Sequence, residues 1–365
     1  MILPHNAPRA LVTVLASALM VLSACNSNEA QSVAATETKE KPISLIRIDE
    51  PTNGSLINQG DRLPLTLKLV DEAVQPDSLT LYINEQSIGR IEGLNHTIMT
   101  EGYKMGTTYI RVTAWKKGQR QTASTSIKIK TNKEPERYTY RIKKTYPHDI
   151  NAYTQGLFYK NGIMYEGTGQ NGKSSIREVE LSTGEPTRTA NLDAQHFGEG
   201  IAMQNGKIYQ LTWTSGKCFV YDAQTLKQTG TFTYRSEGWG LTSDGKQLIM
   251  SDGSNTLYFM NPENFAEASR IEVYDHKGKV TQLNELEYID NLIYANVYQT
   301  ERVVAIDPKT GRVVKEVDFS NLLKPEDMHR NIDVLNGIAW DSTTGRIWVT
   351  GKNWPKLFEV ELVKR

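Results

Sequence analysis

Cysteine is nearly absent from this chain, which has only Cys25 and Cys218 among 365 residues. An internal disulfide is therefore not expected, and no histidine stands out as the partner that a catalytic thiol would need. A net charge of one sign is also missing, because 42 basic and 42 acidic residues cancel. No overall field then attracts a polyanion, so we do not expect nucleic acid as a partner.

Long apolar runs are scarce as well. The run from Leu11 to Leu22 is too short to span a membrane comfortably, and it follows Arg9 at the N-terminus. It ends in Leu22-Ser23-Ala24-Cys25, which resembles a bacterial lipobox, the signal in which the cysteine is lipidated. We therefore interpret residues 1–25 as a lipoprotein signal peptide and 26–41 as a flexible tether. The alternative is an ordinary signal peptide with a chance cysteine.

This interpretation predicts where the protein resides. Lipidation at Cys25 would make that residue the mature N-terminus of an exported bacterial lipoprotein. Asn26, which follows the cysteine, favours the outer membrane of a Gram-negative cell, facing the periplasm. The lipid would be the only attachment to the membrane.

The chain does contain a sequence repeat, which occurs five times after about residue 150. Each copy is a short apolar strand, a polar turn and a second β-rich strand, and successive starts lie 44, 40, 45 and 52 residues apart. This period is typical of a four-stranded propeller blade. We therefore predict an all-β fold with a five-bladed β-propeller over residues 138–365. The copies start at Gly156, Gly200, Gly240, Glu285 and Gly337.

Residues 42–131 have a different character. Alternating segments such as Leu65–Leu69 and Leu79–Ile83 are separated by turn signals, for example Asn53-Gly54 and Lys117-Gly118. The pattern favours a small immunoglobulin-like β-sandwich, joined to the propeller by a linker at 132–137. The segment contains no group of residues that suggests a catalytic or binding site, so a spacer or docking role is the default interpretation.

The repeats also predict which side chains meet. Residues at equivalent positions should lie around one mouth of the propeller channel, and these positions carry a carboxylate, amides, a lysine and aromatic rings. This set favours a lined pocket, although polar residues at blade corners can also serve only to satisfy loop backbone. The residues before each copy are Gln155, Glu199, Trp239, Asn284 and Asn336, and those at the end of each second strand are Gly169, Trp213, Gly253, Tyr298 and Lys352.

Longer motifs give the region a family resemblance. In chain order they include Tyr146-Pro147-His148-Asp149, Phe197-Gly198-Glu199-Gly200, Leu283-Asn284-Glu285-Leu286-Glu287-Tyr288 and Gly351-Lys352-Asn353-Trp354. Together they resemble glutaminyl-peptide cyclotransferase of the plant and bacterial type, over the whole repeat region. The resemblance implies a five-bladed propeller that converts the N-terminal glutamine of peptides or proteins to pyroglutamate and releases ammonia.

Such a reaction has simple demands. The α-amine of the substrate attacks its own side-chain amide, so holding a near-attack geometry supplies much of the acceleration. One carboxylate can accept the amine proton and return it to the departing nitrogen. Glu199 suits this role because it lies between two glycines, and the resemblance places the family's catalytic glutamate there. Trp213 and Trp239 could supply apolar walls that raise its pKa, although core packing is the alternative.

The resemblance assigns further roles. It implies that Gln155 and Asn284 hydrogen-bond the glutaminyl residue and that Phe197 packs against it. Lys352 would lie close to Glu199 and either favour its ionised form or bind a carbonyl oxygen as negative charge develops. Asn336 belongs to the same predicted set through its place in the repeat.

Two positions depart from the family pattern. Tyr298 stands where plant members typically carry tryptophan, and Tyr153 stands where phenylalanine is usual. Both keep an aromatic wall and add a hydroxyl, so we expect an effect on affinity more than on mechanism.

We expect neither a metal nor a cofactor in the reaction, because the six histidines show no ligand spacing. Whether the propeller channel holds a structural cation stays an open question. Two other functions also stay open at this point. One is a non-catalytic propeller that binds a protein or glycan, and the other is a lyase or hydrolase that has reused the pocket.

Overall fold

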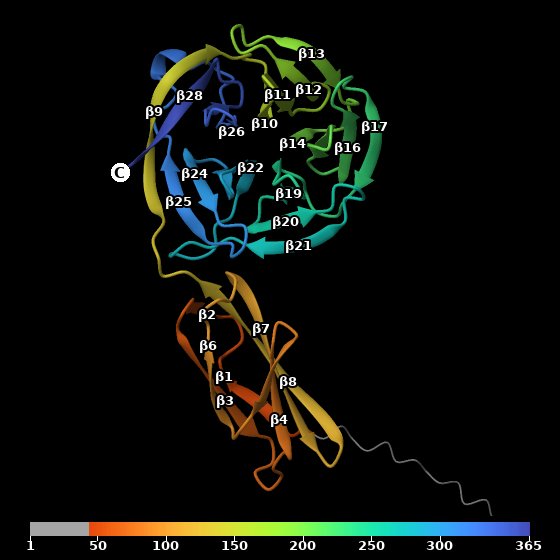
Figure 1. The fold of residues 1–365 in the computed structure, drawn as a ribbon, viewed down its shortest axis with the longest axis vertical. Helices are drawn as coiled ribbons and strands as arrows, with labels where there is room; N and C mark the ends of the chain where they lie inside the picture. The colour runs from red at the N-terminus through yellow and green to blue at the C-terminus, as the bar shows by residue number, and fades with distance from the viewer. Residues whose placement is uncertain (1–43) are drawn as a thin grey trace, which may run out of the picture. The chain divides into compact units, whose positions relative to one another are not determined.

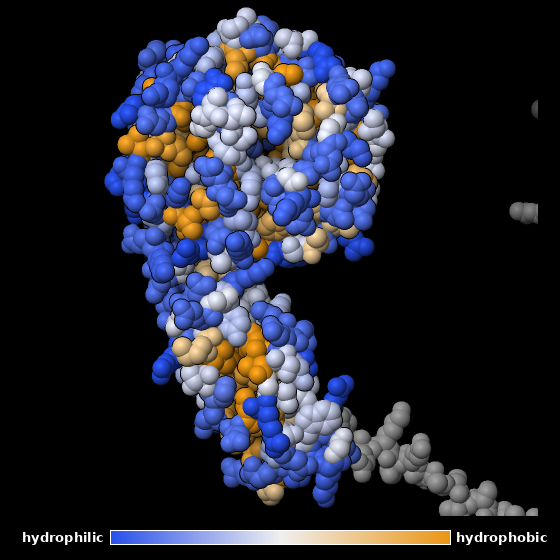
Figure 2. Space-filling view, in the orientation of Figure 1, coloured by the Kyte–Doolittle hydropathy of each residue, from blue (hydrophilic) through white to orange (hydrophobic). Residues whose placement is uncertain are grey.

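A computed structural model describes residues 44–365 of the chain (Figure 1). Cys25, the signal peptide and the whole tether predicted at 26–41 lie outside the described residues. The described part is built from β-strands, with one 3₁₀ turn, η1, at Pro325–Asp327. No helix in this part is long and apolar enough to cross a membrane. The face drawn in Figure 2 is mainly hydrophilic, with smaller hydrophobic areas between the polar side chains.

The N-terminal strands form two sheets around a shared apolar core. Residues alternate between buried and partly exposed along β4, as expected for a strand with one face on a core. The core includes the fully buried side chains of Leu65, Leu81 and Ile110. One sheet contains β1 (Ile46–Glu50), β3 (Arg62–Leu69) and β6 (Asn95–Met99); the other contains β2 (Ser55–Asn58), β8 (Gln119–Lys130), β7 (Gly106–Lys116), β4 (Ser78–Ile83) and β5 (Gln86–Ile91).

The remaining strands form the five four-stranded blades of a propeller, which confirms the predicted fold class. The first blade contains β10 (Thr154–Lys160), β11 (Ile163–Thr168), β12 (Ser175–Val179) and β13 (Pro186–Asn191). The second contains β14 (Gly198–Gln204), β15 (Lys207–Thr212), β16 (Lys217–Asp222) and β17 (Gln228–Thr233). The third contains β18 (Leu241–Ser243), β19 (Leu248–Ser251), β20 (Thr256–Met260) and β21 (Glu267–Glu272).

The last two blades share one continuous sheet. The fourth blade contains β22 (Leu283–Ile289), β23 (Leu292–Val297), β24 (Arg302–Ile306) and β25 (Val313–Asp318). The fifth contains β26 (Leu335–Trp340), β27 (Ile347–Gly351), β28 (Lys356–Lys364) and β9 (Glu136–Pro147).

Strand β9 closes the ring. It pairs antiparallel with β28 along most of its length, and its first residues pair parallel with β25. The outermost strand of the last blade therefore comes from the N-terminal side of the repeats. β9 begins at Glu136, two residues before the predicted start of the propeller.

The innermost strands of four blades carry Gln155, Glu199, Asn284 and Asn336, and Trp239 lies two residues before β18. Figure 1 shows β10, β14, β22 and β26 around the centre of the ring. Adjacent inner strands lie very close together, since a Cβ at Gly200 would be 2.5 Å from the backbone nitrogen of Leu241. Glycine at this position therefore permits the strands to approach.

Candidate active site

A cavity of about 230 Å³ lies where the innermost strands begin. It is polar at its base and aromatic along its sides. Nine of the ten side chains that the sequence predicts as catalytic or substrate-binding line it. They are Tyr153, Gln155, Phe197, Glu199, Trp213, Trp239, Asn284, Tyr298 and Lys352.

Irregular pairing at the strand entrances presents the polar members of this set. The register between the first two strands of a blade shifts around Gln155, around Glu199 and around Asn284. The fifth blade has the same shift around Asn336. A bulge bends the strand and re-aims a side chain, which is why bulges are common beside active sites. The repeated shift therefore turns equivalent residues of four blades toward one end of the ring.

Glu199 is the buried acid of the cavity. Only 5% of the residue is exposed, and its Oε1 accepts a hydrogen bond from Gln155 Nε2 at 3.0 Å. Burial raises the pKa of Glu199 well above its usual range, and the positive charge of Lys352 opposes this only in part. A carboxyl group in this state holds a proton more readily than an exposed one, which suits a group that accepts and returns a proton during a reaction.

Asn336 lies one layer behind the cavity. It is fully buried, and its Nδ2 donates to Thr154 O at 3.0 Å and to Gln155 Oε1 at 3.3 Å. Because these bonds fix the amide of Gln155, the Gln155 Nε2 group faces Glu199. The placement of Asn336 therefore fits support of Gln155, in place of the direct substrate contact that the sequence predicts.

Asn284 presents an acceptor without a partner. The residue is 3% exposed, and its Oδ1 atom makes no hydrogen bond to the described residues. A buried oxygen of this kind is costly unless a ligand or water donates to it. An ammonium or amide N–H group in the cavity would satisfy it.

Lys352 is a buried cation between two aromatic faces. Its Nζ lies 4.8 Å from the centre of the Tyr153 ring and 5.0 Å from that of Tyr298. Burial lowers the pKa of Lys352, while Glu199 and Asp333 act in the opposite direction. The two rings favour the charged form through cation–π attraction. Lys352 thus supplies a positive donor opposite the acid.

Aromatic rings form most of the wall. Phe197 packs edge-on against Tyr153 at 6.1 Å and against Trp213 at 5.7 Å between ring centres. Trp239 packs in the same way against Tyr298 at 5.4 Å. Trp213 is 42% exposed and lies at the mouth. These ring contacts give the cavity a largely apolar wall around its polar side chains.

The sequence did not single out the residue that joins the two halves of this wall. Glu237 Oε2 accepts hydrogen bonds from Trp213 Nε1 at 2.8 Å and Trp239 Nε1 at 2.9 Å. The charge of Glu237 also contributes to the raised pKa of Glu199. Glu237 lies in the connection between the second and third blades, where no repeat position marks it.

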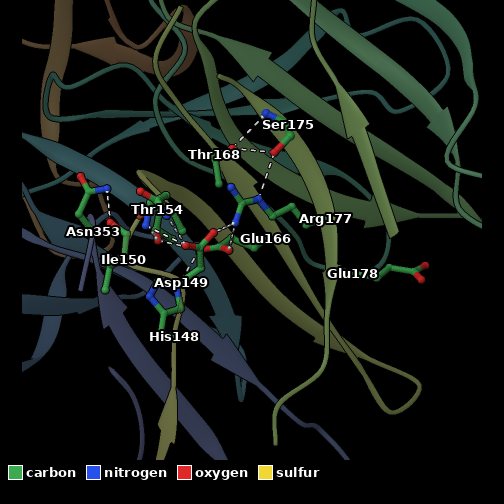
Figure 3. Close-up of polar contacts among 12 residues, drawn as sticks. His148, Asp149, Ile150, Thr154, Glu166, Thr168, Ser175, Arg177, Glu178 and Asn353 are labelled. Carbon is green, nitrogen blue, oxygen red and sulfur yellow. Dashed lines mark hydrogen bonds and ion pairs between the residues drawn. The ribbon is translucent and has the colours of Figure 1, made fainter. Parts of the chain in front are cut away.

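A buried polar cluster supports the cavity from the side of the first and last blades (Figure 3). His148 Nε2 lies 3.0 Å from Glu166 Oε1, and His148 Nδ1 lies 2.7 Å from Trp354 O. Thr154 Oγ1 donates to the same Glu166 oxygen at 2.7 Å. The cluster connects the start of β10, which carries Gln155, to the turn after Lys352.

His148 in this cluster is an imidazolium. A carbonyl oxygen faces one ring nitrogen and a carboxylate faces the other, so both nitrogens donate. Burial by itself would lower the pKa of His148, but the charge and hydrogen bond of Glu166 raise it above its ordinary value. Burial would likewise raise the pKa of Glu166, yet His148 and Arg177 hold it below its usual range. The sequence contained His148 only as part of a motif and gave it no role.

Two further buried carboxyl groups lie on β22 beyond the cavity. Glu285 accepts hydrogen bonds from the backbone of Leu157 and Ile338, at 3.1 and 2.9 Å. Glu287 accepts one from Trp340 N at 3.0 Å, and burial raises its pKa to about 8. Both carboxyl groups tie the inner strands together, so they have a structural role.

The described residues contain no group of three or more histidine, cysteine, aspartate or glutamate side chains that could hold a metal ion. Cys218 is buried in the core, and burial raises the pKa of its thiol. A thiol in this state is a poor nucleophile.

Comparisons with known proteins show what this chain is similar to. The family model described as glutamine cyclotransferase matches residues 110–362, more than half of the chain and every residue that lines the cavity. A glutaminyl-peptide cyclotransferase of Arabidopsis thaliana is 42% identical over 221 residues, which make up 60% of this chain and 69% of the relative. The crystal structure of Myxococcus xanthus glutaminyl cyclase is 38% identical, covers 64% of this chain and 100% of its own, and superimposes with a TM-score of 0.61.

Proposed function

Because the chain belongs to the glutamine cyclotransferase family, we propose that it converts the N-terminal glutamine of peptides or proteins to pyroglutamate and releases ammonia. The observation that carries this proposal is the buried acid Glu199, which has a raised pKa and lies in an aromatic cavity opposite Lys352. An intramolecular reaction needs little more than a fixed conformation and one proton carrier.

Binding uses the unpaired groups of the cavity. The glutaminyl side chain lies between the aromatic walls, with the α-ammonium group directed toward Glu199 and the free Oδ1 atom of Asn284. Phe197 and Trp213 cover the methylene groups. Gly169 leaves room for Phe197 in this wall, since a Cβ there would collide with the Phe197 ring.

The chemical step begins with deprotonation of the amine. The α-ammonium group loses its first proton to solvent, the neutral amine nitrogen forms a bond to the side-chain amide carbon, and Glu199 accepts a second proton from that nitrogen, which gives a five-membered tetrahedral intermediate. The amide oxygen then carries negative charge, and Lys352 Nζ is the donor that stabilises it. Glu199 returns the proton to the amide nitrogen, the carbon–nitrogen bond breaks, and ammonia leaves with its electron pair.

This chemistry consumes no cofactor and needs no metal. The proton that Glu199 takes from the nitrogen ends on ammonia, so Glu199 and Lys352 return to their starting states. Activity should therefore withstand a chelator. Glu199 carries the proton, and Lys352 donates a hydrogen bond to the negatively charged amide oxygen.

The proposal includes an export route. Lipidation at Cys25 would anchor the protein to the outer membrane, facing the periplasm, through the tether at 26–41. The support is the lipobox sequence itself. Radiolabelled palmitate should enter the wild-type protein expressed in a Gram-negative host and be absent from Cys25→Ser. Label that persists in the variant would contradict the anchor.

Mass spectrometry tests the activity directly. A short peptide with N-terminal glutamine should lose the mass of ammonia much faster with protein than without it, and should do so with a chelator present. The same peptide with an acetylated amine cannot provide the nucleophile and should not react. A folded protein that leaves the free peptide at its spontaneous rate would contradict the proposal and favour a non-catalytic binding propeller.

A further inference from the structure

A second and larger cavity lies beside the first. Its volume is about 740 Å³, and it forms an open groove along the connection between the fourth and fifth blades. Its lining comes from residues 299–301, from 321–335 and from Trp354. The steps described for the cyclisation reaction use none of these side chains.

The topology places this groove on the same end of the propeller as the reaction cavity. Strands alternate in direction within each blade, so β25 ends at the end where β26 begins. The connection at residues 319–334 therefore crosses the end that carries Glu199 and Lys352. It is the longest connection between consecutive blades, and it accounts for the spacing of 52 residues between the last two copies of the repeat.

The groove shares a wall with the reaction cavity. Tyr153 lines the cavity, and its hydroxyl group donates to Asp333 Oδ2 at 2.8 Å, while Asp333 lines the groove. On the other side, Tyr298 lines the cavity and the next residue, Gln299, lines the groove. A peptide whose N-terminal glutamine lies in the cavity can therefore place its following residues beyond this shared wall, in the groove.

The connection is held in one conformation. Lys356 Nζ pairs with Asp327 at 2.6 Å, and His329 Nε2 lies 2.8 Å from Asn353 O. Trp354 Nε1 donates to Asp333 O at 2.9 Å. Because these contacts fix the connection, binding to the groove carries a small ordering cost.

The groove offers mainly apolar side chains to a ligand. Met328 is 58% exposed, and Leu323, Pro325 and Ile332 line the groove with it. We propose that this groove binds apolar side chains of the residues that follow the N-terminal glutamine of the substrate. The inference rests on the proposed cyclisation reaction and adds a preference to it: substrates with apolar residues after the glutamine bind better than substrates with glycine there.

Two peptides test the preference. The specificity constants of the full chain for Gln-Leu-Leu-Gly and Gln-Gly-Gly-Gly should differ by about tenfold in favour of the leucine peptide, mainly through KM, because burying an aliphatic side chain contributes about this factor. In Met328→Ser combined with Leu323→Ser the ratio should fall toward one. Met99→Ser is the matched control, since Met99 is 50% exposed on β6 of the N-terminal sandwich, and it should keep the wild-type ratio.

The outcomes separate the two proposals. If the wild-type protein cyclises both peptides with equal specificity constants, the proposed binding of substrate residues in the groove is contradicted. The proposed cyclisation reaction is then still supported. A preference that persists in the double variant would also contradict binding in the groove. If the folded wild-type protein cyclises neither peptide, the proposed reaction itself fails, and the groove inference fails with it.

Discussion

Gln155 Nε2 donates a hydrogen bond to Glu199 Oε1 at 3.0 Å, across the boundary between the first and second blades. The two residues occupy equivalent positions of the repeat, at the bulged start of β10 and of β14. Asn336, at the same position of the last blade, fixes the other end of the Gln155 amide. Blade symmetry thus builds a chain of side chains that orients one carboxyl group.

The buried acid should cost stability. Because burial raises the folded-state pKa of Glu199, its ionisation opposes folding once the pH exceeds the unfolded value of about 4.3. Glu199→Gln should therefore be more stable than the wild-type protein at pH 8, on the order of 1 kcal/mol, and the difference should shrink at pH 4. Chemical denaturation at both pH values measures it. A variant that is less stable at pH 8 would contradict the burial argument.

The His148–Glu166 pair should give the protein a pH window of stability. The raised pKa of His148 means that its contribution is complete below the unfolded value of about 6.5 and is lost as the pH rises through the folded value. The lowered pKa of Glu166 means that its contribution is complete above about 4.3 and is lost as the pH falls through the folded value. We expect His148→Gln to lose about 3 kcal/mol at pH 6, since it breaks a buried pair.

The control for this variant is Lys364→Gln, which removes one partner of an exposed pair with Glu136. It should leave the free energy of unfolding nearly unchanged, because an exposed ion pair contributes little. Equal losses in the two variants, or a loss in His148→Gln that does not depend on pH, would contradict the assignment of a buried imidazolium.

Lys352 should act on the rate more than on binding. Lys352→Met removes the donor for the developing negative charge, so kcat should fall by about 10²- to 10³-fold, with a smaller change in KM. Lys144→Met is a suitable control, because Lys144 also lies over a tyrosine ring, at 4.6 Å from the centre of Tyr146, but is exposed and outside the cavity. Steady-state ammonia release measures both. A Lys352→Met enzyme that differs only in KM would assign Lys352 to binding.

Tyr298 should contribute through its ring. Tyr298→Phe keeps the aromatic face over Lys352 and the edge contact with Trp239, so its specificity constant should stay within about threefold of the wild type. Tyr298→Ala removes both contacts and should raise KM by about tenfold. Equal losses in the two variants would show that the hydroxyl group matters and the ring does not.

The repeat made the inner parts of the site predictable. Gln155, Glu199 and Asn284 stand at positions that recur with each blade, and period alone places recurring positions at one end of a ring. Glu237 and Asp333 lie in connections between blades, which differ in length and follow no period. Their partners are side chains from other blades, so no local sequence pattern indicates the contacts.

The sequence could not predict how the ring of blades closes, for a related reason. Strand β9 pairs with β28, more than two hundred residues away along the chain. Its own sequence shows a strand but not a partner, and five complete copies of the repeat do not reveal that the last blade lacks its outer strand. His148 follows β9 directly and owes its position beside Trp354 to this closure.

Ammonia release by Glu199→Gln from a glutaminyl peptide tests the central claim most directly. The variant keeps the shape of the side chain but cannot carry a proton, so the account predicts a folded protein with turnover reduced by at least about 10²-fold. Glu361→Gln, at an exposed position paired with Arg141, should match the wild type. If folded Glu199→Gln retains wild-type turnover, proton transfer by this carboxyl group is not part of the reaction, and the account is contradicted.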